Sequence, residues 1–203
     1  MALNKEEKIL KATIHCIGKY GIEKTNAQTV ANHLGVAQSG IFYYFPKQQM
    51  LFDSLIHYIV KVNHTITTQH LEKVQPKSSV EELMEHLRGN LLWAKKHPDQ
   101  VGVLLLSMVR AQSSVPMRKL INQILENGQT RIFRCLENAI AAREAHVVSD
   151  PALAAAAIHQ ALTGVIVSYY YARSQTPTID HYFNILQLCV NGLVVDRVGQ
   201  PEA

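Results

Sequence analysis

The chain has 203 residues, of which 47% are hydrophobic, 7% aromatic and 18% charged, and its formal net charge is +4. This composition excludes disordered, collagen-like and low-complexity proteins, and the length allows one large domain or a small domain and a larger one. Three widely spaced cysteines exclude a secreted disulfide scaffold, while the modest positive charge permits a nucleic-acid partner without requiring one.

Nearly every long segment carries apolar residues at helical spacing, and no convincing alternating strand pattern occurs, so an all-α fold is predicted. Capping residues mark several helix starts: Asn4, Asn26, Ser79 with Glu82, and Asp150 before Pro151. About nine helices are expected, over residues 4–19, 26–35, 38–44, 47–74, 79–96, 101–111, 116–144, 150–173 and 178–198. Short helices precede long ones, which indicates a domain over residues 1–46 and a second over residues 47–203.

Residues 27–44 have the pattern of a helix-turn-helix. Ala31 is small where the two helices would meet, and Gly35 lies at the turn, where a positive φ is required. The side facing the core is expected to carry Val30, Leu34, Val36, Ile41 and Tyr44. The second helix of such a motif enters the DNA major groove with its N-terminal residues at base edges. DNA binding is therefore predicted, and a plain helical hairpin within an all-α protein is the alternative.

The stretch GIEKTNAQTVANHLGVAQSGIFYYFPKQQMLFDSLI resembles the DNA-binding domain of TetR-family transcriptional regulators. The matching positions are Gly21, Thr25, Val30, Ala31, Gly35, Val36, Phe42, Tyr43, Phe45 and Leu51. The order of three short helices, a long linking helix and a helical regulatory domain is also similar to that of the family. The resemblance implies a homodimer whose two N-terminal domains reach successive major grooves of double-stranded DNA.

Carried over by position, the resemblance places Gln38 and Ser39 at base edges and Tyr43 at the DNA backbone or a base. Lys47 and Gln48 would lie at the N-terminus of the fourth helix, whose dipole favours a phosphate. The candidate DNA-binding residues are Gln28, Thr29, Gln38, Ser39, Gly40, Phe42, Tyr43, Lys47 and Gln48.

Several positions depart from the family pattern. The family commonly has Ser, Lys, Gly and Thr in sequence where residues 37–40 of this chain are Ala, Gln, Ser and Gly. Phe42 lacks the hydroxyl of the usual Tyr, and the usual Lys is absent at Gln48, although Lys47 is adjacent. Fewer phosphate contacts are expected to lower the affinity for DNA and to weaken its salt dependence.

A stripe of small side chains follows residues 150–173, and an apolar seam follows the last helix. By resemblance, these two helices pair the subunits in a four-helix interface, while packing within one subunit is the alternative. The candidate dimer residues are Ala154, Ala157, Ala161, Gly164, Ser168, Phe183, Leu186, Val190 and Leu193.

The middle helices are apolar, with a few polar residues that are suited to orienting a ligand. This combination is typical of small-molecule sites and predicts a hydrophobic or amphipathic effector. The candidate effector residues are His86, Trp93, Leu105, Met108, Arg110, Gln129 and Tyr169. For the polar ones, and for His159, an ordinary structural role in the core or at the surface is the favoured interpretation.

No metal site, cofactor or enzymatic activity is expected. The histidines at positions 57, 64 and 70 are too far apart along one helix to share an ion, and no Cys-x-x-Cys or His-x-x-x-His spacing occurs. No P-loop, dinucleotide-binding glycine motif or Gly-x-Ser-x-Gly motif is present. The three cysteines are interpreted as buried apolar residues rather than redox sensors.

The start, MALNKEEKIL, lacks the apolar core of a signal peptide, and His159 and Gln160 interrupt the apolar stretch near residue 160, so a cytoplasmic protein without a membrane span is expected. The predicted function is a ligand-responsive repressor that binds a palindromic operator as a homodimer and is released by its effector. The alternative is a helix-turn-helix protein regulated by a protein partner or by concentration alone.

Overall fold

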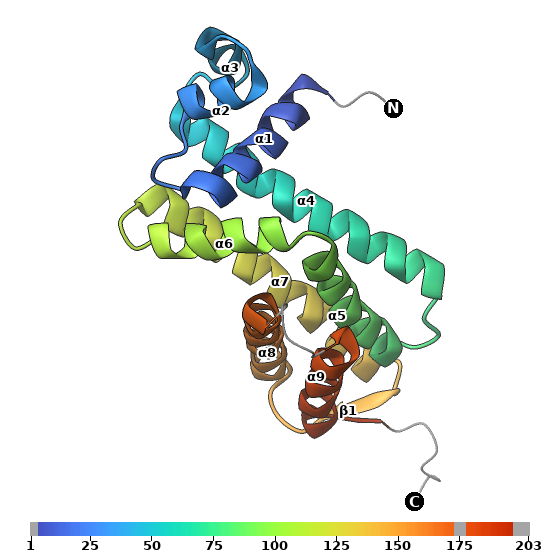
Figure 1. Ribbon diagram of the computed structural model, residues 1–203. Helices are drawn as coiled ribbons and strands as arrows, with labels where there is room; N and C mark the ends of the chain where they lie inside the picture. Colours follow the sequence, from blue (N-terminus) through green and yellow to red (C-terminus); the bar gives the residue numbers. More distant parts are fainter. Residues whose placement is uncertain (1–3, 173–177, 197–203) are drawn as a thin grey trace, which may run out of the picture. The chain divides into compact units, whose positions relative to one another are not determined.

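The computed structural model describes residues 4–172 and 178–196 (Figure 1). Nine helices and two short strands are formed within this part of the chain, so the predicted all-α architecture is confirmed. The helices are α1 (Lys5–Tyr20), α2 (Ala27–Leu34), α3 (Gln38–Tyr44), α4 (Gln48–Val74), α5 (Ser79–Lys96), α6 (Pro98–Arg110), α7 (Val115–Ala141), α8 (Pro151–Ala172) and α9 (Ile179–Leu193). The strands are β1 (Ala145–Val147) and β2 (Val194–Asp196).

The two strands are elements that the sequence pattern did not predict. They pair antiparallel, with His146 opposite Val195 and Val147 opposite Val194. Strands of three residues are too short to show a readable alternation, and β2 continues the apolar run of α9. As a result, α9 ends at Leu193 instead of near residue 198, and the last two residues of the predicted helix lie outside the described part.

Helix starts agree closely with the capping residues read from the sequence. The side chain of Asn4 accepts the Glu6 N–H, and that of Asp150 accepts the Leu153 N–H at 3.0 Å. α6 begins at Pro98, earlier than expected, because proline at the first helical position needs no N–H partner and has a helical φ.

The capping box of α5 is formed one residue earlier than predicted. The Ser78 hydroxyl accepts the Glu81 N–H at 3.0 Å, and the Glu81 carboxylate accepts the Lys77 N–H at 2.7 Å. The prediction of Ser79 with Glu82 is therefore wrong. The Ser79 N–H instead donates to the Glu144 carboxylate at 2.6 Å, which ties the start of α5 to the segment after α7.

Packing divides the chain into two compact units. The N-terminal unit contains residues 1–62 and 97–122, and the C-terminal unit contains residues 63–96 and 123–203. α4 is one continuous helix whose first part belongs to the N-terminal unit and whose last part belongs to the C-terminal unit. The bounds of the two units differ from the domain boundary predicted at residue 46. That the DNA-binding domain consists of residues 1–46 therefore stays a prediction.

The N-terminal unit is built on α1, which packs against α2 and α6, while α2 packs against α3 (Figure 1). One face of α1 is buried, and α4 contributes large side chains that are at most 2% exposed: Phe52, Leu55, Ile56 and Ile59. Burial of each such side chain contributes about 1.5–3 kcal/mol. This core holds the two short helices of the helix-turn-helix.

The C-terminal unit has α8 and α9 side by side, drawn in orange and red in Figure 1, and both contact α5. Its core joins side chains from α5, α7, α8 and α9, including Leu87, Leu136, Ile158 and Leu186. The β1–β2 pair closes the unit by bonding the end of α9 to the connection between α7 and α8.

α8 is the one helix within the described ranges that is long and apolar enough to cross a membrane by length and composition. Its side chains Ala154, Ala155 and Ile158 are nevertheless fully buried in the core of the C-terminal unit. A single such helix is weak evidence for a span, and packing in the core accounts for part of its apolar residues. Only 28% of its most apolar 18-residue window is buried, so α8 also leaves apolar surface uncovered.

Candidate DNA-binding and effector sites

A sharp turn sets the angle between α2 and α3. The Asn26 side chain accepts the Thr29 N–H at 3.0 Å and starts α2, and Gly35 ends it with φ 67° and ψ 32°. This left-handed conformation is favourable for glycine because it has no Cβ. The Val36 N–H donates to the Ala31 carbonyl at 3.1 Å, and Ala31 is fully buried. The roles that the sequence assigned to Ala31 and Gly35 are confirmed.

The outward face of this motif is uncharged and partly aromatic. Tyr43 is 80% exposed and Phe42 is 39% exposed, both on α3. Gln28, Ser39 and Gly40 are exposed, and Gln38 is half-buried. α3 carries no acidic residue that would repel phosphate. The candidate residues on α2 and α3 therefore form one accessible surface with hydrogen-bonding groups suited to base edges.

Two residues of the motif lie differently from the prediction. Val36 is 48% exposed, not buried, because it follows the left-handed glycine and the chain turns it outward. Thr29 is half-buried, and its hydroxyl donates to the Lys24 carbonyl at 3.0 Å. The Thr29 hydroxyl thus stabilises the turn before α2.

Gln48, predicted to meet a phosphate, has its side-chain amide bonded within the N-terminal unit. Its Nε2 donates to the Thr25 carbonyl at 2.9 Å, and its Oε1 accepts the Ala27 N–H at 3.2 Å. The first residue of α4 therefore caps the first turn of α2. Lys47 precedes it, is exposed and accepts the Leu51 N–H at its carbonyl, so it occupies the N-cap position, where the helix dipole favours an anion.

The seven predicted effector residues are divided between the two units. Leu105, Met108 and Arg110 belong to the N-terminal unit, and His86, Trp93, Gln129 and Tyr169 belong to the C-terminal unit. Two of them contact rings of their own unit. The Arg110 guanidinium lies 4.7 Å over the Phe52 ring, and Tyr169 packs edge-on against Tyr182 at 5.5 Å.

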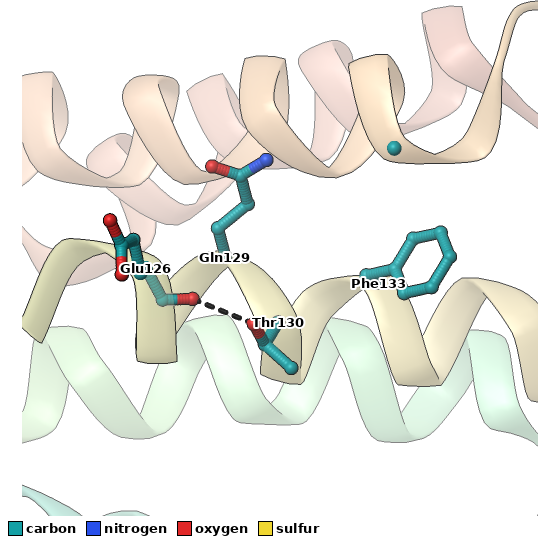
Figure 2. A pocket seen from close by; sticks show the side chains of 5 residues that line it. Glu126, Gln129, Thr130 and Phe133 are labelled. Carbon is teal, nitrogen blue, oxygen red and sulfur yellow. Dashed lines mark hydrogen bonds between the residues drawn. The ribbon is translucent and has the colours of Figure 1, made fainter. Parts of the chain in front are cut away.

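A pocket of about 270 Å³ lies between α7 and α8 in the C-terminal unit. It is lined by Glu126, Gln129, Thr130, Phe133 and Ala152. Figure 2 shows Gln129 reaching from α7 toward α8, while the Thr130 hydroxyl donates to the Glu126 carbonyl at 2.8 Å. The pocket contains Gln129 alone among the predicted effector residues, and its volume is slightly below the range of about 300–1,000 Å³ that is usual for ligand sites.

A polar network lies deeper in the same unit, around His86. Asn63 Nδ2 donates to Asn90 Oδ1 at 3.0 Å, and Asn90 Nδ2 donates to the His86 carbonyl at 2.9 Å and approaches His86 Nε2 at 3.4 Å. His86 is 6% exposed, and its Nδ1 has no hydrogen-bond partner. Burial, followed by the nearby Arg131 charge, lowers the pKa of His86 to about 4. The sequence indicated His86 but not Asn63 or Asn90. Of these two, only Asn90 had a signal in the sequence, because it follows His86 by four residues and so lies on the same face of α5.

The candidate dimer residues separate into two groups. Ala154 and the α9 residues Phe183, Leu186 and Val190 are buried in the core of the C-terminal unit, so the prediction that they meet a partner is wrong. The apolar spacing on α9 marks its inward face instead. Gly164 and Ser168 are exposed, while Ala157, Ala161 and Leu193 are half-buried. Large apolar side chains on the outward faces are Leu153 (64% exposed), Tyr171 (72%), Ile185 (41%) and Leu188 (74%).

Residues with metal-binding or redox chemistry are dispersed. Across residues 4–172 and 178–196, no group of three or more His, Cys, Asp or Glu side chains is placed to hold a metal ion. Cys16 and Cys135 are buried, and burial raises the pKa of Cys135 to about 11. A thiol that stays protonated at neutral pH is a poor nucleophile and a poor redox sensor.

Residues 9–55 match the sequence model of the bacterial regulatory proteins of the tetR family. Over 193 residues the chain is 24% identical to the nucleoid occlusion factor SlmA of Photobacterium profundum, covering 90% of this chain and 94% of that protein. Residues 9–55, which match the family model, contain α2, α3 and the start of α4, and these elements carry the candidate DNA-binding residues.

Solved structures share the whole fold. The transcriptional regulator FadR of Bacillus subtilis in complex with stearoyl-CoA has a TM-score of 0.75 at 21% identity, covering 93% of this chain and all of that one. A regulator from Saccharomonospora viridis in complex with choline has a TM-score of 0.77 at 17% identity, covering 95% of this chain and 98% of that one. The helix-turn-helix at residues 27–44 thus lies within the segment that matches the tetR-family model, and the fold of the chain is similar to that of solved transcriptional regulators.

Proposed function

We propose that this regulator is a non-enzymatic, ligand-responsive repressor that binds a palindromic operator as a homodimer. The observation that carries the DNA-reading role is the accessible, uncharged face of α3, led by Tyr43 at 80% exposed. Gln38, Ser39 and Gly40 at the start of α3 are proposed to meet base edges, with Phe42 and Tyr43 at the flank. Lys47 and the free N–H groups of the first turn of α4 are proposed to bind a phosphate.

Operator binding tests this proposal. A duplex selected from a random library is expected to be palindromic, with half-sites one helical turn, about 34 Å, apart. Tyr43→Ala is expected to weaken binding about tenfold or more in fluorescence anisotropy without loss of helicity. The matched control is Tyr20→Ala, at the exposed end of α1, which is expected to retain wild-type affinity. Equal affinity of the two variants for the operator would exclude α3 as the reading element.

We propose that the outward faces of α8 and α9 form the dimer interface. Leu188 is 74% exposed on α9 and Tyr171 is 72% exposed on α8, and a partner subunit would remove such apolar side chains from water. The exposed Gly164 and Ser168 on α8 allow a second helix to approach closely. Leu188→Arg is expected to shift the protein from dimer to monomer in sedimentation. Gln187→Arg, at an exposed neighbouring position on α9, is the control.

Effector control is proposed to act through α4. Gln48 bonds the start of this helix to α2, and later in the same helix Asn63 bonds to Asn90 of α5. A ligand that displaces α5 would therefore move α4, and with it the separation of the two recognition helices in the dimer. The ligands in the FadR and Saccharomonospora viridis structures support a small-molecule effector, and the amphipathic stearoyl-CoA of FadR supports an amphipathic one.

The second candidate function is regulation by a protein partner or by concentration, without a small effector. It is favoured by the likeness along nearly the whole chain to a protein named nucleoid occlusion factor. Anisotropy of the operator complex against a library of amphipathic and uncharged metabolites separates the two candidates. Release of DNA by at least one compound supports effector control, while an operator affinity that no compound changes supports the partner-regulated alternative.

A further inference from the structure

The hydrogen bonds around His86 define which ring nitrogen carries the proton. Asn90 is oriented by two contacts, because its Oδ1 accepts from Asn63 and its Nδ2 donates to the His86 carbonyl. This orientation turns the NH2 group of Asn90 toward His86 Nε2, which must accept. In the neutral imidazole, Nδ1 then carries the hydrogen. The structure thus holds a buried N–H donor on His86 that has no acceptor.

One fixed positive charge, that of Arg131, lies near this donor without a paired carboxylate. Arg131 and the two histidines His64 and His159 are close enough to disfavour protonation of His86. The Arg131 Nη2 lies 3.1 Å from His64 Nε2, and none of the ion pairs in the described part of the chain includes Arg131. The Glu82 carboxylate on α5 helps to raise the pKa of Cys135, but it forms no ion pair with Arg131.

Close packing brings His159 into the same cluster. Its ring lies over Gly128 on α7, where an added Cβ would be only 2.4 Å from His159 Nε2. Gly128 precedes Arg131 by one helical turn, so the ring and the guanidinium come from neighbouring positions on the α7 surface. Apolar core side chains adjoin the cluster on α5 and α7: Leu83, Leu87, Leu91, Ile132 and Leu136.

We propose that this cluster binds the carboxylate of an amphipathic monocarboxylic acid, which receives the His86 Nδ1–H and pairs with the Arg131 guanidinium. A carboxylate oxygen satisfies the orphan donor, whose desolvation is otherwise uncompensated. One negative charge balances the single fixed positive charge of Arg131, whereas a phosphate dianion would leave excess charge beside the core. The apolar side chains of α5 and α7 then take the hydrocarbon part of the ligand. This assignment rests on the proposed effector-responsive function and names the chemistry of that effector.

The test compares acids with alcohols of the same chain length. The full-length protein is titrated with straight-chain carboxylates of eight, twelve and sixteen carbons and with the matching alcohols, using the fluorescence of its single tryptophan, Trp93 on α5. At least one carboxylate is expected to bind about tenfold or more tightly than its alcohol. Arg131→Gln is expected to remove this preference, and Arg134→Gln, at an exposed position of α7, is the matched control that retains it. Since Arg131 is partly exposed, its substitution is tolerated by the fold, and His86→Leu gives a second measurement.

Each outcome decides the assignment. Binding of a carboxylate that is weakened tenfold by Arg131→Gln but not by Arg134→Gln supports it. Equal binding of acid and alcohol, an acid affinity indifferent to Arg131→Gln, or no carboxylate binding at any length overturns it. Operator affinity is measured on the same samples. If the protein binds its operator and a molecule of another class releases it, the proposed function holds and only the carboxylate assignment fails.

Discussion

His86 is expected to make the C-terminal unit less stable as the pH falls. Its side chain is 6% exposed, and burial lowers its pKa from 6.5 to about 4. Between these two values the unfolded chain binds a proton that the folded chain does not. The free energy of unfolding is therefore at its full value above a pH of about 6.5 and decreases as the pH falls toward 4. From pH 7 to pH 5, this one group lowers it by about 2 kcal/mol.

Urea unfolding at fixed protein concentration, followed by Trp93 fluorescence at pH 7 and pH 5, measures this effect. Wild type is expected to lose about 2 kcal/mol more than His86→Leu between the two pH values. His159, whose pKa burial also lowers, is present in both proteins and cancels. His146→Gln, at an exposed position of β1, is the control and is expected to behave as wild type. An equal pH dependence of wild type and His86→Leu would refute the reasoning.

The N-terminal unit offers two paired comparisons. Gln48→Ala removes the amide that ties α4 to α2 and is expected to lower protection of the Val30 amide against hydrogen exchange by about 1–3 kcal/mol. Gln49→Ala, which loses only a bond within α4, is expected to cost less than about 0.5 kcal/mol. Gly35→Ala is expected to cost about 1–2 kcal/mol in thermal unfolding because of its positive φ. Gly40→Ala, with open space and an ordinary φ, is expected to stabilise α3 by up to about 1 kcal/mol. Equal effects within either pair would contradict the assigned roles.

Features set by neighbouring residues were predictable from the sequence. The bounds of α3 and α5 and the cap at Asn26 depend on local periodicity and side chains within one helical turn. The same locality explains the one-residue error at α5, because serines occur at 78 and 79 and glutamates at 81 and 82. Both pairs satisfy the capping pattern, and only the backbone conformation selects between them.

Features set by distant residues were not predictable in the same way. An apolar seam such as Phe183 and Leu186 has one spacing whether it faces its own core or a partner, so its direction needed the packing of α5 and α8. The bond from Gln48 to the start of α2 and the approach of Arg131 to His64 likewise join residues far apart in the chain. These long-range contacts determine which side chains meet at the candidate sites, and local sequence patterns do not encode them.

The composition of the N-terminal unit has a practical consequence for engineering. α1 packs against α6, which begins only after residue 97, so the N-terminal unit is formed by two separate segments of the sequence. In a chimaera joined at residue 46, α1 would pack against a foreign α6. The foreign α4 would also lack the Gln48 bonds to Thr25 and Ala27 unless it carried a glutamine there. A graft that exchanges residues 1–62 together with 97–122 would keep both contacts, so the proposed DNA specificity is best transferred with these two segments together.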